Sequence, residues 1–180
     1  MSLSRKSIYD PDGKLVTMAN GAAYRASVEN VRKGNVGDPG QLMGTVTDPT
    51  PIASLFENTS QGVFGRAANA FSGVALPVGA SAQIHPGAAQ IRATIQNDIV
   101  REYSVEILKV YPKSDINGRN MLLKVTDPRL LETTGGIVQG MSGSPIIQDG
   151  KLVGAVTHVL VNDPTTGYGI FIENMLDAAG

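Results

Sequence analysis

The sequence predicts a mostly β fold, a barrel or a sandwich, and three features of the chain support this. Short segments in which apolar and polar residues alternate follow one another along its 180 residues. Turn signals separate these segments, and the 21 glycines and 10 prolines fit a turn-rich globular domain. A chain of this length buries roughly 70% of its unfolded surface. One domain, or two small halves that share a core, can therefore fold without disulfides or a bound metal.

The first third of the chain is expected to hold short strands and loops. Asp10-Pro11-Asp12-Gly13 predicts a turn, and Asn20-Gly21 predicts a hairpin turn because both residues accept positive φ. Residues 22–33 fit a strand or a helix by periodicity, and the glycines on both sides favour a strand. Residues 34–44 are rich in Gly and Pro and predict a loop, whereas residues 45–60 predict a connector with one short apolar segment.

Successive strands are predicted next, at residues 74–80, 88–96, 98–111 and 119–126. The third is the clearest, since β-branched and aromatic residues largely alternate with charged ones along it. A brief helix is predicted at residues 128–134, with Asp127 as its N-cap and Pro128 at its first position. Two strands joined by Gln148-Asp149-Gly150 follow, and the chain closes with a strand that runs into a short terminal helix.

Composition excludes several classes of function. The formal net charge of −1 and the isoelectric point of about 6.1 give no electrostatic footprint for nucleic acid or for an anionic membrane. The chain has no cysteine, which rules out disulfides, thiolate zinc sites and a cysteine nucleophile. Its two histidines, His85 and His158, belong to no ligand-spaced motif, so neither a metal nor another cofactor is expected. No apolar run reaches the length of a membrane span.

The stretch from Gly140 to Pro145, with sequence GMSGSP, has the features of a nucleophile site. A serine hydroxyl becomes a nucleophile when a base takes its proton and backbone N–H groups stabilise the resulting oxyanion. The flanking glycines permit a sharp turn that directs such groups to one point, with Gly140 and Ser142 as the expected donors. The elbow of α/β-hydrolases requires G-x-S-x-G followed by a helix, whereas here Ser144 and a proline precede a predicted strand.

The stretch instead resembles the G-x-S-G-[G/S]-P motif of trypsin-like serine proteases. In those proteins a loop carries the serine, and residues 151–157 lie where a wall of the specificity pocket would follow. The resemblance narrows over residues 126–176 (TDPRLLETTGGIVQGMSGSPIIQDGKLVGAVTHVLVNDPTTGYGIFIENML), which are similar to the peptidase domain of the stage IV sporulation protein B family. Weaker similarity extends upstream through Ser27-Val28, Lys33-Gly34, Pro39-Gly40, residues 62–65 and residues 102–110.

This resemblance implies an architecture and a biological setting. It implies a trypsin-like double β-barrel in a single peptidase domain, with halves at roughly residues 4–97 and 98–180. It also implies a PDZ domain and a membrane anchor upstream, neither present in this sequence. The expected activity is cleavage of a membrane-bound regulatory protein in sporulation signalling, at or across the forespore membrane. The fragment itself is expected to be soluble.

Carried over residue by residue, the resemblance assigns Ser142 as nucleophile and Asp127 as the acid of the triad. The sequence alone favours Asp127 as a helix N-cap, and the two roles are compatible. Thr157 and His158 fall where the walls of the substrate pocket are expected, although His158 is equally compatible with a hydrogen-bonded strand residue.

The histidine of the family has no counterpart here. It lies in a Gly-His dipeptide that aligns with Ser4-Arg5-Lys6. The opening Met1-Ser2-Leu3 resembles a cloning start, which favours a chain that begins just downstream of the histidine over one that has lost it. His85 would keep the His, Asp, Ser order but stands elsewhere than the family base, and Lys6 as a base rests only on its position.

Two hypotheses of different classes follow. In the first, the chain is a serine endopeptidase domain in which Ser142 attacks, Asp127 orients a histidine, and the N–H groups of Gly140 and Ser142 bind the oxyanion. In the second, it is a catalytically dead protease-like barrel that binds a protein partner. A Gly-His dipeptide immediately upstream of residue 4 in the full-length protein would favour the enzyme.

Overall fold

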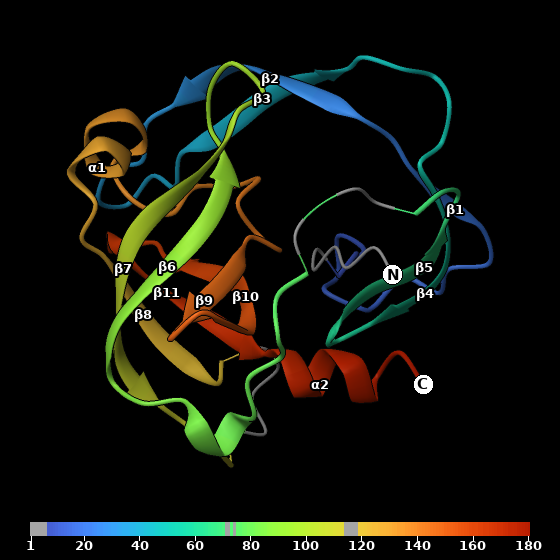
Figure 1. Cartoon of the computed structure of the whole chain (residues 1–180). Coiled ribbons are helices and arrows are strands. Elements are labelled where there is room, and N and C mark those ends of the chain that lie inside the picture. Colours follow the sequence, from blue (N-terminus) through green and yellow to red (C-terminus); the bar gives the residue numbers. More distant parts are fainter. Residues whose placement is uncertain (1–6, 71–72, 74, 114–118) are drawn as a thin grey trace.

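The computed structural model describes residues 7–70, 73, 75–113 and 119–180 (Figure 1). The chain is mostly β and ends in a short helix, and its C-terminal half forms a closed barrel. This arrangement is consistent with the trypsin-like fold that the family resemblance implies. The helices among the described residues are too short and too polar for any of them to cross a membrane.

Six antiparallel strands close the barrel in the order β6-β7-β8-β11-β10-β9, with β9 returning to β6. The strands are β6 (Gly87–Thr94), β7 (Val100–Val110), β8 (Met121–Val125), β9 (Pro145–Gln148), β10 (Lys151–Leu160) and β11 (Asp163–Phe171). Every second side chain along β6 and β7 points inward, for example Ile91 and Ile107, both fully buried. A barrel of this size has an interior that side chains fill, so these residues form the main core.

Two short helices follow strands of the barrel. Helix α1 (Pro128–Thr134) begins and ends where the sequence predicts, because Asp127 caps its first turn and Gly135 ends it in the left-handed region. Helix α2 (Ile172–Asp177) closes the chain, as predicted. A 3₁₀ turn (Ser81–Gln83) precedes β6.

The N-terminal half of the described chain consists of two small antiparallel sheets. Strand β1 (Gly21–Ala23) pairs with β4 (Ala53–Thr59), which pairs with β5 (Gly62–Ala67). Among the described strands, β2 (Ala26–Arg32) pairs only with β3 (Gln41–Val46). Figure 1 shows the β2–β3 ribbon above the barrel and the β1–β4–β5 sheet beside it.

Several local predictions differ from the structure. Asn20-Gly21 does not turn a hairpin, because β1 pairs with the distant β4 rather than with its neighbour. Strands β3 and β4 occupy much of the stretch predicted as loop and connector at residues 34–60. The described residues of 75–80 form no strand, and Val78 makes only an isolated bridge to Leu152. These pairings are non-local, so short-range patterns do not reveal them.

The boundary expected near residues 97 and 98 falls inside a hairpin of the barrel. Asn97 and Asp98 have φ values of 57° and 54° in the turn between β6 and β7. Strand β6 pairs with β7 over its whole length, from Gly87 opposite Ile107 to Thr94 opposite Val100. The closed barrel therefore already includes residues 87–94.

A second apolar cluster joins the N-terminal half to the barrel. Phe64 of β5 is 2% exposed and packs with residues of β10, β11 and α2. The other buried members of this cluster are Ala155, Ile170, Ile172 and Met175. Because it joins three parts of the chain, this cluster holds the two halves together.

We expect Phe64→Ala to lower the free energy of unfolding by about 3–4 kcal/mol, since it removes a buried aromatic ring and leaves a cavity. Urea denaturation followed by circular dichroism measures the change. Phe56→Ala is the matched control, because Phe56 lies on the neighbouring strand and is 55% exposed, and it should cost less than about 1 kcal/mol. Equal losses in the two variants would show that the cluster does not hold the halves together.

Candidate active site

The loop between α1 and β9 carries Ser142. Gly140 and Gly143 on either side have φ values of 101° and 94°, a region that favours glycine. Two reverse-turn hydrogen bonds shape this loop, from Met141 N–H to the Val138 carbonyl (3.1 Å) and from Ser144 N–H to the Met141 carbonyl (3.0 Å). The glycines therefore place Ser142 at the tip of a tight double turn.

The Ser142 side chain is half-buried and fixed by one described hydrogen bond. Its hydroxyl donates to the backbone carbonyl of Thr157 on β10, with 2.9 Å between the two oxygens. On either side of this contact, Gly143 N–H donates to the Val156 carbonyl and Val156 N–H donates to the Ser144 carbonyl, both at 2.9 Å. The serine loop therefore extends the β9–β10 pairing to residues that precede the start of β9.

A β-bulge in β10 directs the Thr157 carbonyl toward Ser142. The register with β11 passes from Val156 opposite Gly169 to His158 opposite Tyr168, and thus skips Thr157. An extra residue of this kind leaves the regular ladder and re-aims its groups, which is common beside active sites. The buried Thr157 hydroxyl donates to the Tyr168 carbonyl at 3.0 Å, which ties the bulge back to β11.

His158 supports the same bulge from its exposed side. Its Nδ1 lies 3.0 Å from the Thr157 hydroxyl oxygen. Because the only proton of that hydroxyl goes to the Tyr168 carbonyl, we assign Nδ1 of His158 as the donor in this contact. The two residues expected to line the substrate pocket thus lie in the network around Ser142.

The backbone N–H groups of the loop divide into two sets. Those of Met141, Gly143 and Ser144 donate within the protein. Those of Gly140 and Ser142 donate to no acceptor among the residues that the structure describes. Two neighbouring N–H groups available beside a serine hydroxyl are the elements required to bind an oxyanion.

Asp127 lies in a different set of contacts. Its carboxylate is 3% exposed and accepts hydrogen bonds from the N–H groups of Ser104, Arg129 and Leu130 and from the guanidinium of Arg129. The Arg129 side chain, together with these N–H groups, lowers the pKa of the Asp127 carboxyl to about 2, against the opposing effect of burial. The structure therefore shows the N-cap role, and it shows no hydrogen bond between Asp127 and Ser142 among the described residues.

His85 is held at another turn of the barrel. Its Nε2 lies 3.1 Å from the Asp149 carboxylate in the β9–β10 turn, and its Nδ1 lies 3.0 Å from the Pro86 carbonyl. The Pro86 carbonyl and then Asp149 raise the pKa of His85 above its ordinary value. Its described side-chain contacts thus tie it to Asp149 and Pro86. Residues 4–6, where the family histidine aligns and where Lys6 lies, fall outside the described part of the chain.

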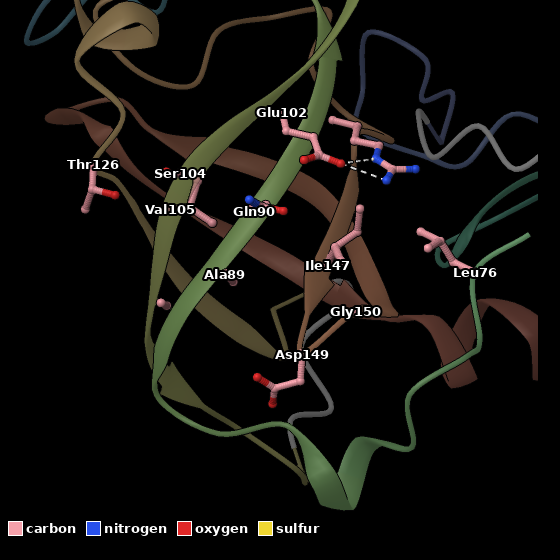
Figure 2. A pocket seen from close by; sticks show the side chains of 12 residues that line it. Leu76, Ala89, Gln90, Glu102, Ser104, Val105, Thr126, Ile147, Asp149 and Gly150 are labelled. Atoms are coloured by element: carbon pink, nitrogen blue, oxygen red, sulfur yellow. Dashed lines mark hydrogen bonds and ion pairs between the residues drawn. The ribbon is translucent and has the colours of Figure 1, made fainter. Parts of the chain in front are cut away.

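A groove of about 480 Å³ lies along the wall of the barrel (Figure 2). Strands β6, β7 and β9 line it, with Gln90, Ser104 and Ile147 among the labelled residues. An ion pair of 2.7 Å between Arg92 and Glu102 lies beside it. Its described lining includes neither Ser142 nor Thr157. We therefore do not assign this groove to the candidate active site.

Sequence reasoning missed two features of the site. The Thr157 carbonyl is a backbone group turned by a bulge, for which the sequence gives no signal. Ile137, five residues before Ser142 in the same loop, is 2% exposed and belongs to the main core cluster. The only hint of it is the apolar pair Ile137-Val138 between glycines.

A comparison with models of protein families finds a match to this sequence. The family model described as SpoIVB peptidase S55 matches residues 6–176, which is nearly the whole sequence. No curated protein matches the chain.

The Asp127 contacts predict a pH-dependent stability. Because the folded pKa of about 2 lies below the ordinary 3.8, the stabilisation is present above about pH 4 and is lost as the pH falls toward 2. Asparagine keeps a capping oxygen but loses the charge, so we expect Asp127→Asn to cost about 1–2 kcal/mol in free energy of unfolding at pH 7, and much less near pH 2. Urea denaturation at the two pH values measures this.

Asp149→Asn is the control for this measurement. Asp149 forms the exposed pair with His85, so its loss should change the stability by less than about 0.5 kcal/mol at pH 7. A cost for Asp127→Asn that stays constant from pH 7 to pH 2 would contradict the assignment of the lowered pKa to this carboxylate.

Proposed function

The chain belongs to the SpoIVB peptidase S55 family, a family of serine peptidases, and from this we propose that it is an endopeptidase domain with Ser142 as nucleophile. One observation carries the proposal. The Ser142 hydroxyl is fixed beside the N–H groups of Gly140 and Ser142, which donate to no acceptor among the described residues. In this proposal these N–H groups bind the oxyanion that forms when the serine attacks a peptide carbonyl.

The base is the part of the mechanism that this geometry does not supply. A carbonyl oxygen such as that of Thr157 accepts a hydrogen bond but does not take the proton at neutral pH, so it orients Ser142 without activating it. We assign the base to a histidine immediately upstream of residue 4, where the family resemblance puts it. His85 is a poor substitute because its ring is bonded to Asp149 and Pro86.

Asp127 completes the proposed triad only if its contacts rearrange. Both carboxylate oxygens of Asp127 accept hydrogen bonds in the structure. Three of these hydrogen bonds come from backbone N–H groups. Its other partner, the guanidinium of Arg129, is exposed and also donates to the Glu102 carbonyl. We propose that an imidazole takes the place of this guanidinium when the histidine is present.

The substrate and setting are also proposed from the family resemblance. The substrate is a protein, and the resemblance indicates a membrane-bound regulator cleaved in sporulation signalling at the forespore membrane. We propose an extended peptide as the bound form, because a peptide in this form gains main-chain hydrogen bonds when it lies beside a strand.

A binding module without catalysis is the second candidate. The observation in its favour is that the Ser142 proton points to the Thr157 carbonyl rather than to a base. In that case the same loop and strand would bind a partner peptide and leave it intact.

Labelling by a fluorophosphonate probe tests the proposal. The 180-residue chain should label hardly at all, since loss of the triad histidine costs roughly 10⁶-fold in turnover. A version extended upstream through a Gly-His dipeptide should label, and Ser142→Ala should abolish the labelling. Ser144→Ala is the matched control two residues away and should leave it largely unchanged.

Two outcomes would contradict the assignment. Strong labelling of the 180-residue chain that is lost in His85→Ala would show that His85 is the base. An extended, histidine-containing version that never labels would favour the binding module.

A further inference from the structure

Strands β10 and β11 continue beyond the contact of Ser142 with Thr157. The residue whose carbonyl Ser142 attacks must place its side chain within a few ångströms of the serine. Beyond the contact with Thr157, β10 continues through His158 and Val159, which pair with Tyr168 and Gly167 of β11. A substrate side chain that leaves the serine along β10 therefore meets the surface formed by β10, β11 and the loop that precedes Ser142.

Ile137 of that loop contacts β11 at Gly167. A carbon added to Gly167 would come within 2.6 Å of Cδ1 of Ile137 and within 2.5 Å of the His158 carbonyl oxygen. The isoleucine side chain thus rests directly on the bare backbone of Gly167. Val159, the strand partner of Gly167, packs against the same apolar cluster from β10.

The backbone of the loop keeps Ile137 in this place. Its N–H group donates to the Pro164 carbonyl at 2.8 Å, and Gly136 passes so close to Pro164 that a side chain at Gly136 would overlap it. Ile137 is 2% exposed, so it has little room to swing away. No charged or polar side chain takes part in this contact between Ile137, Val159 and Gly167.

We propose that Ile137, resting on Gly167, restricts the substrate residue on the acyl side of the scissile bond to a small side chain such as Gly, Ala or Ser. This inference rests on the proposed function, because it takes Ser142 as the attacking group. A larger side chain would have to displace a buried isoleucine. The restriction is steric and apolar, so it selects by size rather than by charge.

Product-like peptides test the proposal without requiring catalysis. Acetyl-Ala-Ala-Ala and acetyl-Ala-Ala-Leu with free carboxylates are titrated into the ¹⁵N-labelled chain, and the amide signals of Gly140 and Ser142 are followed by NMR. In the wild type the peptide that ends in Ala should shift both signals, and the peptide that ends in Leu should bind at least tenfold more weakly.

Two variants change the size of the site. Ile137→Ala should raise the affinity for the Leu-ended peptide at least tenfold and change that for the Ala-ended peptide less than threefold. Ile137→Val removes only the Cδ1 atom over Gly167, so it disturbs the core least and should give an intermediate gain. Ile107→Val is its matched control, a buried isoleucine of the same cluster on β7, and should leave the preference unchanged.

The possible failures are distinct. Equal binding of both peptides to the wild type, or an unchanged preference in the well-folded Ile137→Val and Ile137→Ala variants, would overturn the role of Ile137 and leave the proposed function standing. If neither peptide shifts the Gly140 and Ser142 amides in any variant, the assignment of these groups as oxyanion donors is wrong, and the inference falls with it.

Discussion

The serine loop depends on backbone hydrogen bonds to three other segments of the chain. Gly143 donates to the Val156 carbonyl of β10, and Ile137 donates to the Pro164 carbonyl of β11. Gln139 exchanges hydrogen bonds with residues 40 and 42 at the start of β3. A loop rich in glycine would otherwise lose much conformational entropy on ordering, and these bonds offset that cost. The position of Ser142 is therefore a property of the whole barrel and of the β2–β3 ribbon.

The candidate site combines side-chain and backbone groups that this loop holds together. The hydroxyl comes from a side chain, the acceptor from a bulged carbonyl at Thr157, and the expected oxyanion donors from N–H groups that the turn leaves unused. A change in the turn or in the bulge would move all three together. Asp127 contributes indirectly to the position of the loop, because it fixes the start of α1 and α1 leads directly into the loop.

Local signals predicted part of this structure well. Asp127 followed by Pro128 gave the bounds of α1, because capping and a proline at the first turn act within a few residues. Alternation along residues 100–110 gave β7, and Gln148-Asp149-Gly150 gave the hairpin after the serine. The sharp turn predicted around Ser142 is also present, because the glycines that shape it adjoin the serine in sequence.

Other features depend on residues far apart in the chain. Two examples are the pairing of β1 with β4 and the contact of Ile137 with Gly167. Both join segments that are thirty residues or more apart, and no pattern within either segment specifies the partner. The bulge at Thr157 is also invisible in the sequence, because every residue around it is of a type that is common in regular strands. The Asp127 contacts differ again: the capping role was visible in the sequence, whereas the ion pair with Arg129 depends on the direction in which a long side chain turns.

The closure of the barrel has a consequence for its motions. Strands β6 and β9 share only two residue pairs, Gln90 with Ile147 and Ile91 with Ile146, whereas β6 and β7 share eight. A seam with so few pairs is the place where a closed barrel opens most readily by local fluctuation. Because β9 follows the serine loop after one residue, Ser144, each opening of this seam would loosen one end of the loop. Amide hydrogen exchange at Ile146 and Ile147 would therefore report on the rigidity of the nucleophile as well as on the barrel.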